Sequence, residues 1–335
     1  MQDIADACGL SRNTVSKVFN GRGSVPRATR ELILQKAEEL GYGTPVDGPR
    51  AAQNKGTIAL LTSKLPENAH FGVFFMTMFA DRISRAGYTL RIFEISGEEL
   101  RQRSLPPNFS PEQTAGIACV ELLSAPYLEM ISGLGIPTVV IDSPRHAVST
   151  LMTCDYVSME NLASTMMVVD RLISMGAERI GFVGDREHCG SFYERWFAFC
   201  VGMRRAGLQP DERICILAPD DAPYDDADWL IRQMRRMPSM PDAFVCANDY
   251  LAIQLMGAVK KIGLAIPGDV MITGFDGTPH AALVDPPLTT VEVRGTEIGQ
   301  IAAHVLLNRI GDPNFPYAWT RVKTVPVWRG STRQP

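Results

Sequence analysis

Residues 3–21 read DIADACGLSRNTVSKVFNG, and residues 25–42 read VPRATRELILQKAEELGY. A first short helix is predicted at residues 2–8, and Gly9 ends it, because glycine tolerates the backbone conformation that a tight turn requires. Ser11 follows at the position where a side-chain oxygen caps the next helix. Three short helices joined by tight turns within about forty residues are typical of a helix-turn-helix module.

The second helix, predicted at residues 12–19, has two distinct faces. Val15, Val18 and Phe19 recur at spacings of three and four residues, which places them on one buried stripe. The opposite stripe contains hydrogen-bond donors and no acid: Arg12, Asn13, Ser16, Lys17 and Asn20. Arginine, lysine and asparagine can bond base edges in the major groove, and small polar side chains suit phosphate oxygens. We therefore expect this stripe to bind DNA; a helical head used only for protein contacts is the alternative.

The charge of the chain is uneven. Residues 1–36 carry six Lys or Arg and three acids, a net charge of +3, whereas the whole chain has a net charge of −4. The remaining residues therefore sum to −7. A basic head on an acidic body indicates a polyanionic partner for the head alone, although a solvated charged face gives the same count.

Cysteine usage and hydropathy indicate the compartment. The seven cysteines are scattered and form no Cys-x-x-Cys pair, which favours reduced thiols over a disulfide framework or a zinc cluster. No apolar run reaches the roughly 18 residues that a membrane span needs. The N-terminus also lacks the basic and apolar regions of a secretory signal. We therefore expect a cytoplasmic protein without a membrane span.

From Thr57 onward, apolar strand-like runs alternate with helical segments, the pattern of α/β folds with parallel sheets. The runs TIALLT, YTLRIF, AGIACVEL and IPTVVID are expected in one lobe, and RIGFVG, ICIL, DAFVCAND and DVMITGFD in a second. Helices are predicted at residues 72–86, 158–175, 194–206, 249–262 and 295–309. Ligands of such sheets bind beyond the carboxyl ends of the strands.

Polar side chains stand at several of these strand ends. Asp142, Asn248 and Asp276 each follow a predicted strand and suit a polyhydroxylated ligand, although capping of the next helix also explains Asn248. Arg195 lies near the start of a helix, where the helix dipole disfavours a cation. It therefore requires an anionic or hydroxyl partner, which a ligand or a loop acid in a salt bridge would supply.

The head resembles that of the LacI/GalR (lac-repressor-like) family of bacterial regulators, over nearly all of residues 2–42. The resemblance implies that Arg12, Asn13 and Lys17 read bases, and that Thr14, Ser16 and Asn20 contact phosphates. Lys17 departs from the arginine that is usual in the family. Because an ammonium lacks the planar bidentate fork of arginine, we expect softer base discrimination there.

The linker departs further from the family. In relatives this stretch forms a short hinge helix on DNA, and its leucine wedges into the minor groove. Residues 43–56 contain no leucine, and Gly48 and Pro49 oppose a helix. We therefore expect a segment that is flexible when free of DNA.

The body resembles, more loosely, the periplasmic-binding-protein fold that these regulators use. The phrases RIGFVGD, CANDYLA, DVMITGFDG and VPVWRGSTR match family landmarks in order. The resemblance implies six effector-site residues. They are Arg195, Asn248, Asp276 and Asp142 as polar contacts, and Phe71 and Tyr224 as stacking walls.

No nucleotide-binding, esterase or zincin motif occurs, and the five histidines are dispersed, so we expect no enzyme, metal or cofactor. We predict a sequence-specific DNA-binding repressor that acts as a homodimer on a pseudo-palindromic operator and responds to a small, sugar-like effector. A solute-binding protein of the same fold with a non-functional head is the alternative.

The predicted domains are 1–42 (helix-turn-helix), 43–56 (linker) and 57–331 (body). Within the body, we expect lobe 1 at about 57–157 and 292–316, and lobe 2 at about 158–291 and 317–331.

Overall fold

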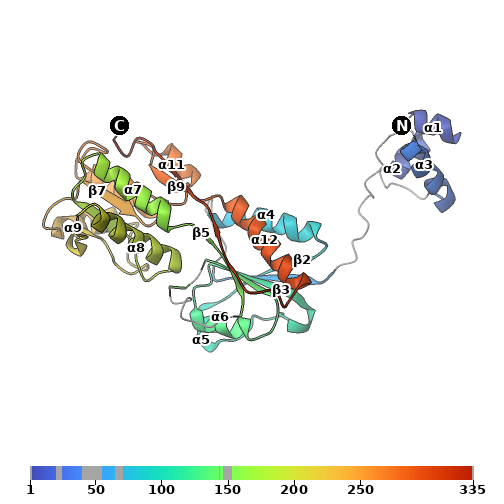
Figure 1. The fold of residues 1–335 in the computed structure, drawn as a ribbon, viewed down its shortest axis with the longest axis horizontal. Coiled ribbons are helices and arrows are strands. Elements are labelled where there is room, and N and C mark those ends of the chain that lie inside the picture. The colour runs from blue at the N-terminus through green and yellow to red at the C-terminus, as the bar shows by residue number, and fades with distance from the viewer. Residues whose placement is uncertain are drawn as a thin grey trace. The chain divides into compact units, whose positions relative to one another are not determined.

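A computed structural model describes residues 2–19, 25–39, 55–64, 71–142, 144–145 and 153–333. The chain divides into two compact units, Met1–Lys55 and Gly56–Pro335. Figure 1 shows the first as a small helical body and the second as an α/β body. The predicted linker lies almost entirely outside the described residues.

The first unit, the head, consists of three helices, α1 (Gln2–Cys8), α2 (Arg12–Phe19) and α3 (Arg27–Glu39). Its core consists of Ile4, Ala5, Val15, Val18, Ile33 and Ala37, all buried. Gly9 has a φ of 65° in the turn between α1 and α2, a conformation that favours glycine. The Ser11 hydroxyl accepts a hydrogen bond from the Thr14 amide at 3.1 Å and so caps α2. The predicted ranges of the first two helices, 2–8 and 12–19, are confirmed.

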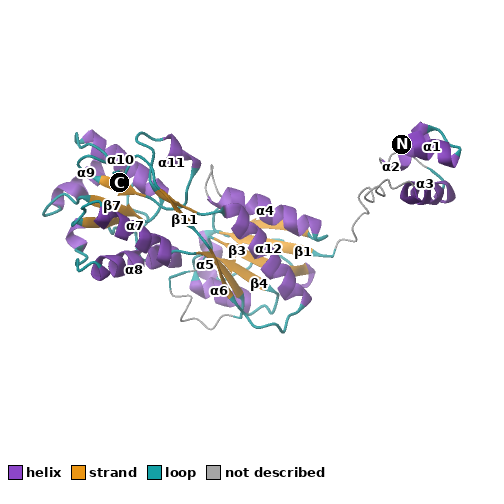
Figure 2. Cartoon of the chain, turned by 45° about the horizontal axis from the view of Figure 1, so that its top comes forward, coloured by secondary structure: helices purple, strands orange, loops and turns teal. Residues whose placement is uncertain are grey.

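The first lobe of the body contains a six-stranded parallel sheet of order β10-β5-β4-β3-β1-β2. Its strands are β1 (Thr57–Thr62), β2 (Thr89–Glu94), β3 (Thr114–Val120), β4 (Thr138–Ile141), β5 (Asp155–Met159) and β10 (Trp319–Val322). Figures 1 and 2 show α4 (Phe71–Arg85) and α12 (Gly295–Gly311) side by side on one face, and α5 (Gly97–Gln102) and α6 (Ala125–Ser132) on the other. The short 3-10 helix η1 (Pro111–Gln113) precedes β3.

The close approach of α4 and α12 depends on a glycine. A Cβ atom added at Gly299 would lie 2.4 Å from the Phe75 carbonyl oxygen. Because only glycine fits there, the two helices can pack backbone to backbone and bury Phe75 and Phe79 against the sheet.

The second lobe contains a three-stranded parallel sheet of order β6-β7-β8, formed by β6 (Ile180–Val183), β7 (Ala243–Cys246) and β8 (Met271–Thr273). Its helices are α7 (Leu162–Ser174), α8 (Gly190–Arg205), α9 (Ala227–Arg236), α10 (Asp249–Lys261) and α11 (Pro279–Leu283). A separate antiparallel pair joins β9 (Thr290–Glu292) to β11 (Val325–Val327). None of the described helices is both long and apolar enough to cross a membrane.

Three features of the body differ from the expected elements. Residues 155–159 form a strand of the first sheet, and the following helix begins at Leu162 rather than at 158. The segment 319–322, expected in the second lobe, pairs with β5 in the first sheet. The ICIL run forms one bridge, Val183 to Ile216, after the 3-10 helix η3 (Glu212–Ile214). The first two differences share a cause, because β5 and β10 pair with each other across a long stretch of sequence.

Candidate functional site

The outward face of α2 carries the predicted DNA contacts. Arg12, Asn13 and Lys17 are exposed, and Thr14 and Ser16 are half-buried. Asn20 lies outside the described residues. No acidic side chain occurs in α2, so this face can approach a polyanion without like-charge repulsion.

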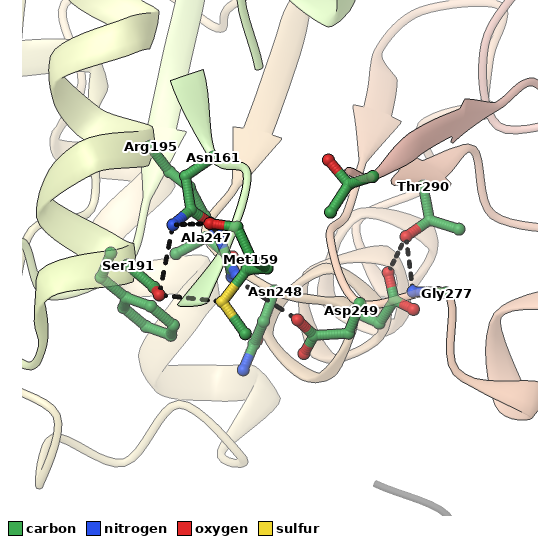
Figure 3. A network of polar contacts seen from close by, with 12 residues as sticks. Met159, Asn161, Ser191, Arg195, Ala247, Asn248, Asp249, Gly277 and Thr290 are labelled. Carbon is green, nitrogen blue, oxygen red and sulfur yellow. Dashed lines mark hydrogen bonds and ion pairs between the residues drawn. The ribbon is translucent and has the colours of Figure 1, made fainter. Parts of the chain in front are cut away.

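In the body, Arg195 of α8 is the centre of a polar network. Its side chain is 3% exposed. Nε donates to Asn161 Oδ1 at 2.9 Å, and Nη1 donates to the Ala247 carbonyl at 2.6 Å and lies 3.5 Å from Asp276 Oδ1. Figure 3 shows Arg195, Asn161 and Ala247 close together. The guanidinium also covers the Phe275 ring, 3.6 Å from its centroid. The loop-acid salt bridge that the sequence left open is therefore present.

Asp276 follows β8 with a φ of 115°, in the left-handed region that non-glycine residues avoid. Burial raises the pKa of its carboxyl to about 7. Arg195 opposes this increase in pKa, whereas the negative charges of Asp249, Glu121 and Asp142 add to it. The strand end thus holds a carboxyl group poised to change charge near neutral pH.

Asp142 approaches the same region from the first lobe. It directly follows β4 with a φ of 56°, and its Oδ1 accepts a hydrogen bond from Ser191 Oγ of α8 at 2.8 Å. Because Ser191 belongs to the second lobe, this contact joins the two lobes. Glu121, which directly follows β3 with a φ of 51°, adds a third carboxylate near Asp276 and Asp142. Glu121 was not among the predicted site residues, although it carries the same signal in the sequence as Asp142, a charged residue directly after a buried strand.

Asn248 and Asp249 begin α10 in different ways. Asn248 Oδ1 accepts from the Leu251 amide at 2.9 Å and caps the helix. The buried Asp249 accepts from the Thr278 amide at 2.7 Å and from the Thr290 hydroxyl, and Figure 3 shows the latter contact. Asp249 therefore ties α10 to β9, while the Asn248 cap uses only the amide oxygen.

A pocket of about 380 Å³ opens beside Asp276, within the size range of small-molecule sites. Its lining includes Phe74 of α4, Thr278, Glu292, Arg294 and Arg329, together with neighbouring residues of segments 276–279 and 292–296. Residues of both lobes contribute to it. The arrangement can hold a small polar ligand with apolar contact on one side.

Two comparisons of sequence bear on the identity of the chain. A family model described as bacterial regulatory proteins, lacI family, matches residues 1–44, and one for a periplasmic binding protein-like domain matches residues 169–332. The HTH-type transcriptional regulator reg1 of Streptomyces lividans is 30% identical over 99% of this chain and 96% of its own length. The chain belongs to the LacI family.

Solved structures agree with this LacI-family fold. A complex of the transcriptional regulator CelR with cellobiose has a TM-score of 0.72 at 24% identity, and a lac repressor dimer bound to operator and the anti-inducer ONPF has a TM-score of 0.73 at 20% identity. Each comparison covers 98% of both chains. At these identities the likeness establishes the fold over nearly the whole LacI-family chain.

The two predicted stacking walls of this LacI-family protein are Tyr224 and Phe71. Tyr224 is 4% exposed, its hydroxyl donates to the Ala218 carbonyl at 2.8 Å, and its ring packs edge-on against Trp229. Tyr224 therefore lies in the core of the second lobe. Phe71 begins α4, but its side chain is outside those described. Both assignments stay predictions.

Sequence reasoning missed Asn161, which contacts Arg195 directly. Asn161 stands between β5 and α7, so it is a polar residue at a strand end like the others. We predicted a helix from residue 158 onward, so the end of β5 was not recognised as a strand end.

Proposed function

We propose that this LacI-family chain is a transcriptional repressor that binds a pseudo-palindromic operator as a homodimer. The observation that carries the proposal is the exposed, acid-free face of α2 with Arg12, Asn13 and Lys17 in a LacI-type head. Relatives named as regulators and a lac repressor dimer bound to operator support it. We assign residues 1–42 to DNA binding, 43–56 to a linker and 57–331 to the effector-binding body. Operator binding requires access to the chromosome, so the proposal places the chain in the cytoplasm.

The effector is proposed to be a small polar molecule of sugar-like character, bound without chemical change. Arg195, Asn248, Asp276 and Asp142 would supply its polar contacts, because carboxylates, an amide and a guanidinium can each bond neighbouring hydroxyls. The pocket supports the role of Asp276, which lines it; the roles of Arg195, Asn248 and Asp142, which are not among its lining residues, rest on the family resemblance and on the polar network. The CelR structure contains cellobiose, which makes that disaccharide a reasonable first probe.

A reporter gene placed behind the DNA upstream of the chain's own gene tests repression. We expect wild type to lower reporter expression and the variant Arg12→Ala/Asn13→Ala to lose this effect. Expression that rises with wild type would contradict repression. Expression unaffected by wild type would favour the alternative, a solute-binding protein of the same fold with a non-functional head.

Thermal unfolding in the presence of cellobiose and other neutral sugars tests the effector site. A ligand that binds only the folded state stabilises it by about 2.7 kcal/mol at a concentration of 100 Kd. We expect Asp276→Asn to abolish the increase in Tm produced by any sugar that stabilises wild type. An equal increase in the variant would place that sugar elsewhere.

A further inference from the structure

A continuous chain of polar contacts links the first sheet to the effector site. Arg321 of β10 lies 2.6 Å from Glu194 of α8, and the other carboxylate oxygen of Glu194 accepts from Asn161 Nδ2 at 2.9 Å. Asn161 in turn bonds Arg195 at 2.9 Å, and Arg195 pairs with Asp276. The chain thus starts on one lobe and ends beside the pocket.

The Asn161 side chain is held in one orientation by its contacts in this network. The side chain is fully buried, and the two N–H groups of its amide nitrogen are shared among three acceptors, the Met159 carbonyl, Ser191 Oγ and Glu194. Figure 3 shows Asn161 lying between Ser191 and Arg195. With its amide oxygen bonded to Arg195 as well, Asn161 cannot turn without leaving a buried polar group unpaired, which is costly.

Asn161 also stands where two connections between the lobes meet. The Glu160 amide donates to the Val322 carbonyl at 2.8 Å, and Thr324 Oγ1 donates to the Glu160 carbonyl at 2.7 Å. Ser164 and Thr324 share a further hydroxyl contact at 2.7 Å. The connection from β5 to α7 is therefore tied to the connection from β10 to β11 beside Asn161.

The Glu194–Arg321 pair is the part of the network that can open. Its side chains are 19% and 34% exposed, whereas Asn161 and Arg195 are buried. A change in the angle between the lobes would separate Arg321 from Glu194 before it disturbed the buried contacts. Conversely, a ligand that shifts Arg195 would act on Glu194 through Asn161.

We propose that Asn161 and Glu194 are positioning residues that couple Arg195 at the effector site to the first lobe through Arg321, and so set the lobe arrangement that the operator selects. This inference rests on the proposed function. Operator affinity then depends on the Glu194–Arg321 pair, although neither residue contacts DNA. The effector and the operator would each shift the equilibrium between the closed and the open Glu194–Arg321 pair, as coupling between distant sites requires.

Two measurements on the full chain test the coupling, with Glu194→Gln, Arg321→Met and the double variant. The first is the distance between labels on unnatural amino acids at Arg82 of α4 and Arg235 of α9, one on each lobe, measured after dilution with unlabelled protein. We expect a shifted or broader distance distribution in all three variants. Arg321→Lys, which keeps the charge, should restore the wild-type distribution in part.

The second measurement is affinity for the DNA upstream of the chain's own gene. Each single variant should change it by about 2- to 30-fold, in the same direction, and the double variant by no more than the larger single effect, because both changes remove one pair. Arg179→Met is the matched control, since Arg179 pairs with Asp242 at 2.7 Å within the second lobe alone. It should change neither measurement.

An unchanged distance distribution in Glu194→Gln and Arg321→Met would overturn the coupling, whatever the DNA result. Additive changes in operator affinity would also overturn it. Wild type that shows no preference for the upstream DNA would instead contradict the proposed function. The distance measurement needs neither DNA nor effector, so it still decides whether the Glu194–Arg321 pair sets the arrangement of the lobes.

Discussion

Arg309 of α12 and Asp155 of β5 form an ion pair in which both side chains are almost fully buried, 4% and 3% exposed, with Nε 2.9 Å from Oδ2. A second bond joins Nη2 to Oδ1 at 3.1 Å, which makes the pair bidentate. Asp155 Oδ1 also accepts from the Ala318 amide at 2.9 Å. The pair therefore holds the segment before β10 against β5.

Removal of one partner should destabilise the body strongly. We expect Asp155→Ala to lower the free energy of unfolding by about 3–5 kcal/mol, because it leaves the Arg309 guanidinium buried and uncompensated. Chemical denaturation measures the change. Asp81→Ala is the control, since its pair with Arg85 lies on the exposed surface of α4 and should be nearly neutral. Similar effects for the two variants would contradict the structural role of the buried pair.

Asp276 should make stability depend on pH. Its pKa is raised to about 7 in the folded state, so between its ordinary value and about 7 the folded state binds more protons than the unfolded state. Stability should therefore decrease as pH rises from about 4 to about 7, and this contribution should level off above that range. Denaturation of wild type and Asp276→Asn across this range isolates the effect. The stability difference between them should change with pH, and a constant difference would show that folding does not raise the pKa of Asp276.

Lys17 should limit base discrimination. Lys17→Arg introduces a planar, bidentate donor on the exposed face of α2, and we expect a higher ratio of affinity for upstream DNA over random DNA. Competition binding at fixed salt measures this ratio. The same substitution at Lys260, in α10 of the body, should leave it unchanged. A lower ratio in Lys17→Arg would mean that the ammonium makes a contact that guanidinium cannot.

Two of the helical glycines, Gly299 and Gly257, should respond oppositely to alanine. At Gly299 a Cβ would meet the Phe75 carbonyl oxygen at 2.4 Å, and we expect Gly299→Ala to destabilise the body by about 1–3 kcal/mol through overpacking. At Gly257, inside α10, a Cβ meets nothing within 4 Å, so Gly257→Ala should stabilise it by about 0.5–1 kcal/mol. Thermal or chemical unfolding separates these effects. Equal changes would imply that α4 and α12 can move apart.

The elements that were predicted correctly depend on local signals. The bounds of α1 and α2 follow from the apolar stripe of Val15 and Val18, the turn at Gly9 and the cap at Ser11, all within a few residues. The strand ends that carry Asp142 and Asp276 were likewise visible from short apolar runs. These signals also sufficed to predict the two-lobed α/β body.

The elements that were missed depend on distant residues. The strand β10 exists because Trp319–Val322 pairs with β5, and Arg309 reaches Asp155 across 154 positions of sequence. No local pattern encodes such a pairing. Asn161 was missed for the same reason. It follows β5, and because that strand was not predicted, its end was not recognised. The burial of Tyr224 likewise depends on packing against Trp229, which no local pattern predicts.

The proposed function depends on specific DNA binding by the α2 face. The most direct test measures the affinity of the full chain for its own upstream DNA at two salt concentrations, for wild type and Arg12→Ala/Asn13→Ala. We predict specific binding by wild type whose logarithm falls with log salt at about −0.9 per phosphate contact, and loss of the preference over random DNA in the variant. Wild-type binding that shows no preference for the upstream DNA, or a preference unchanged in the variant, would contradict the proposed function.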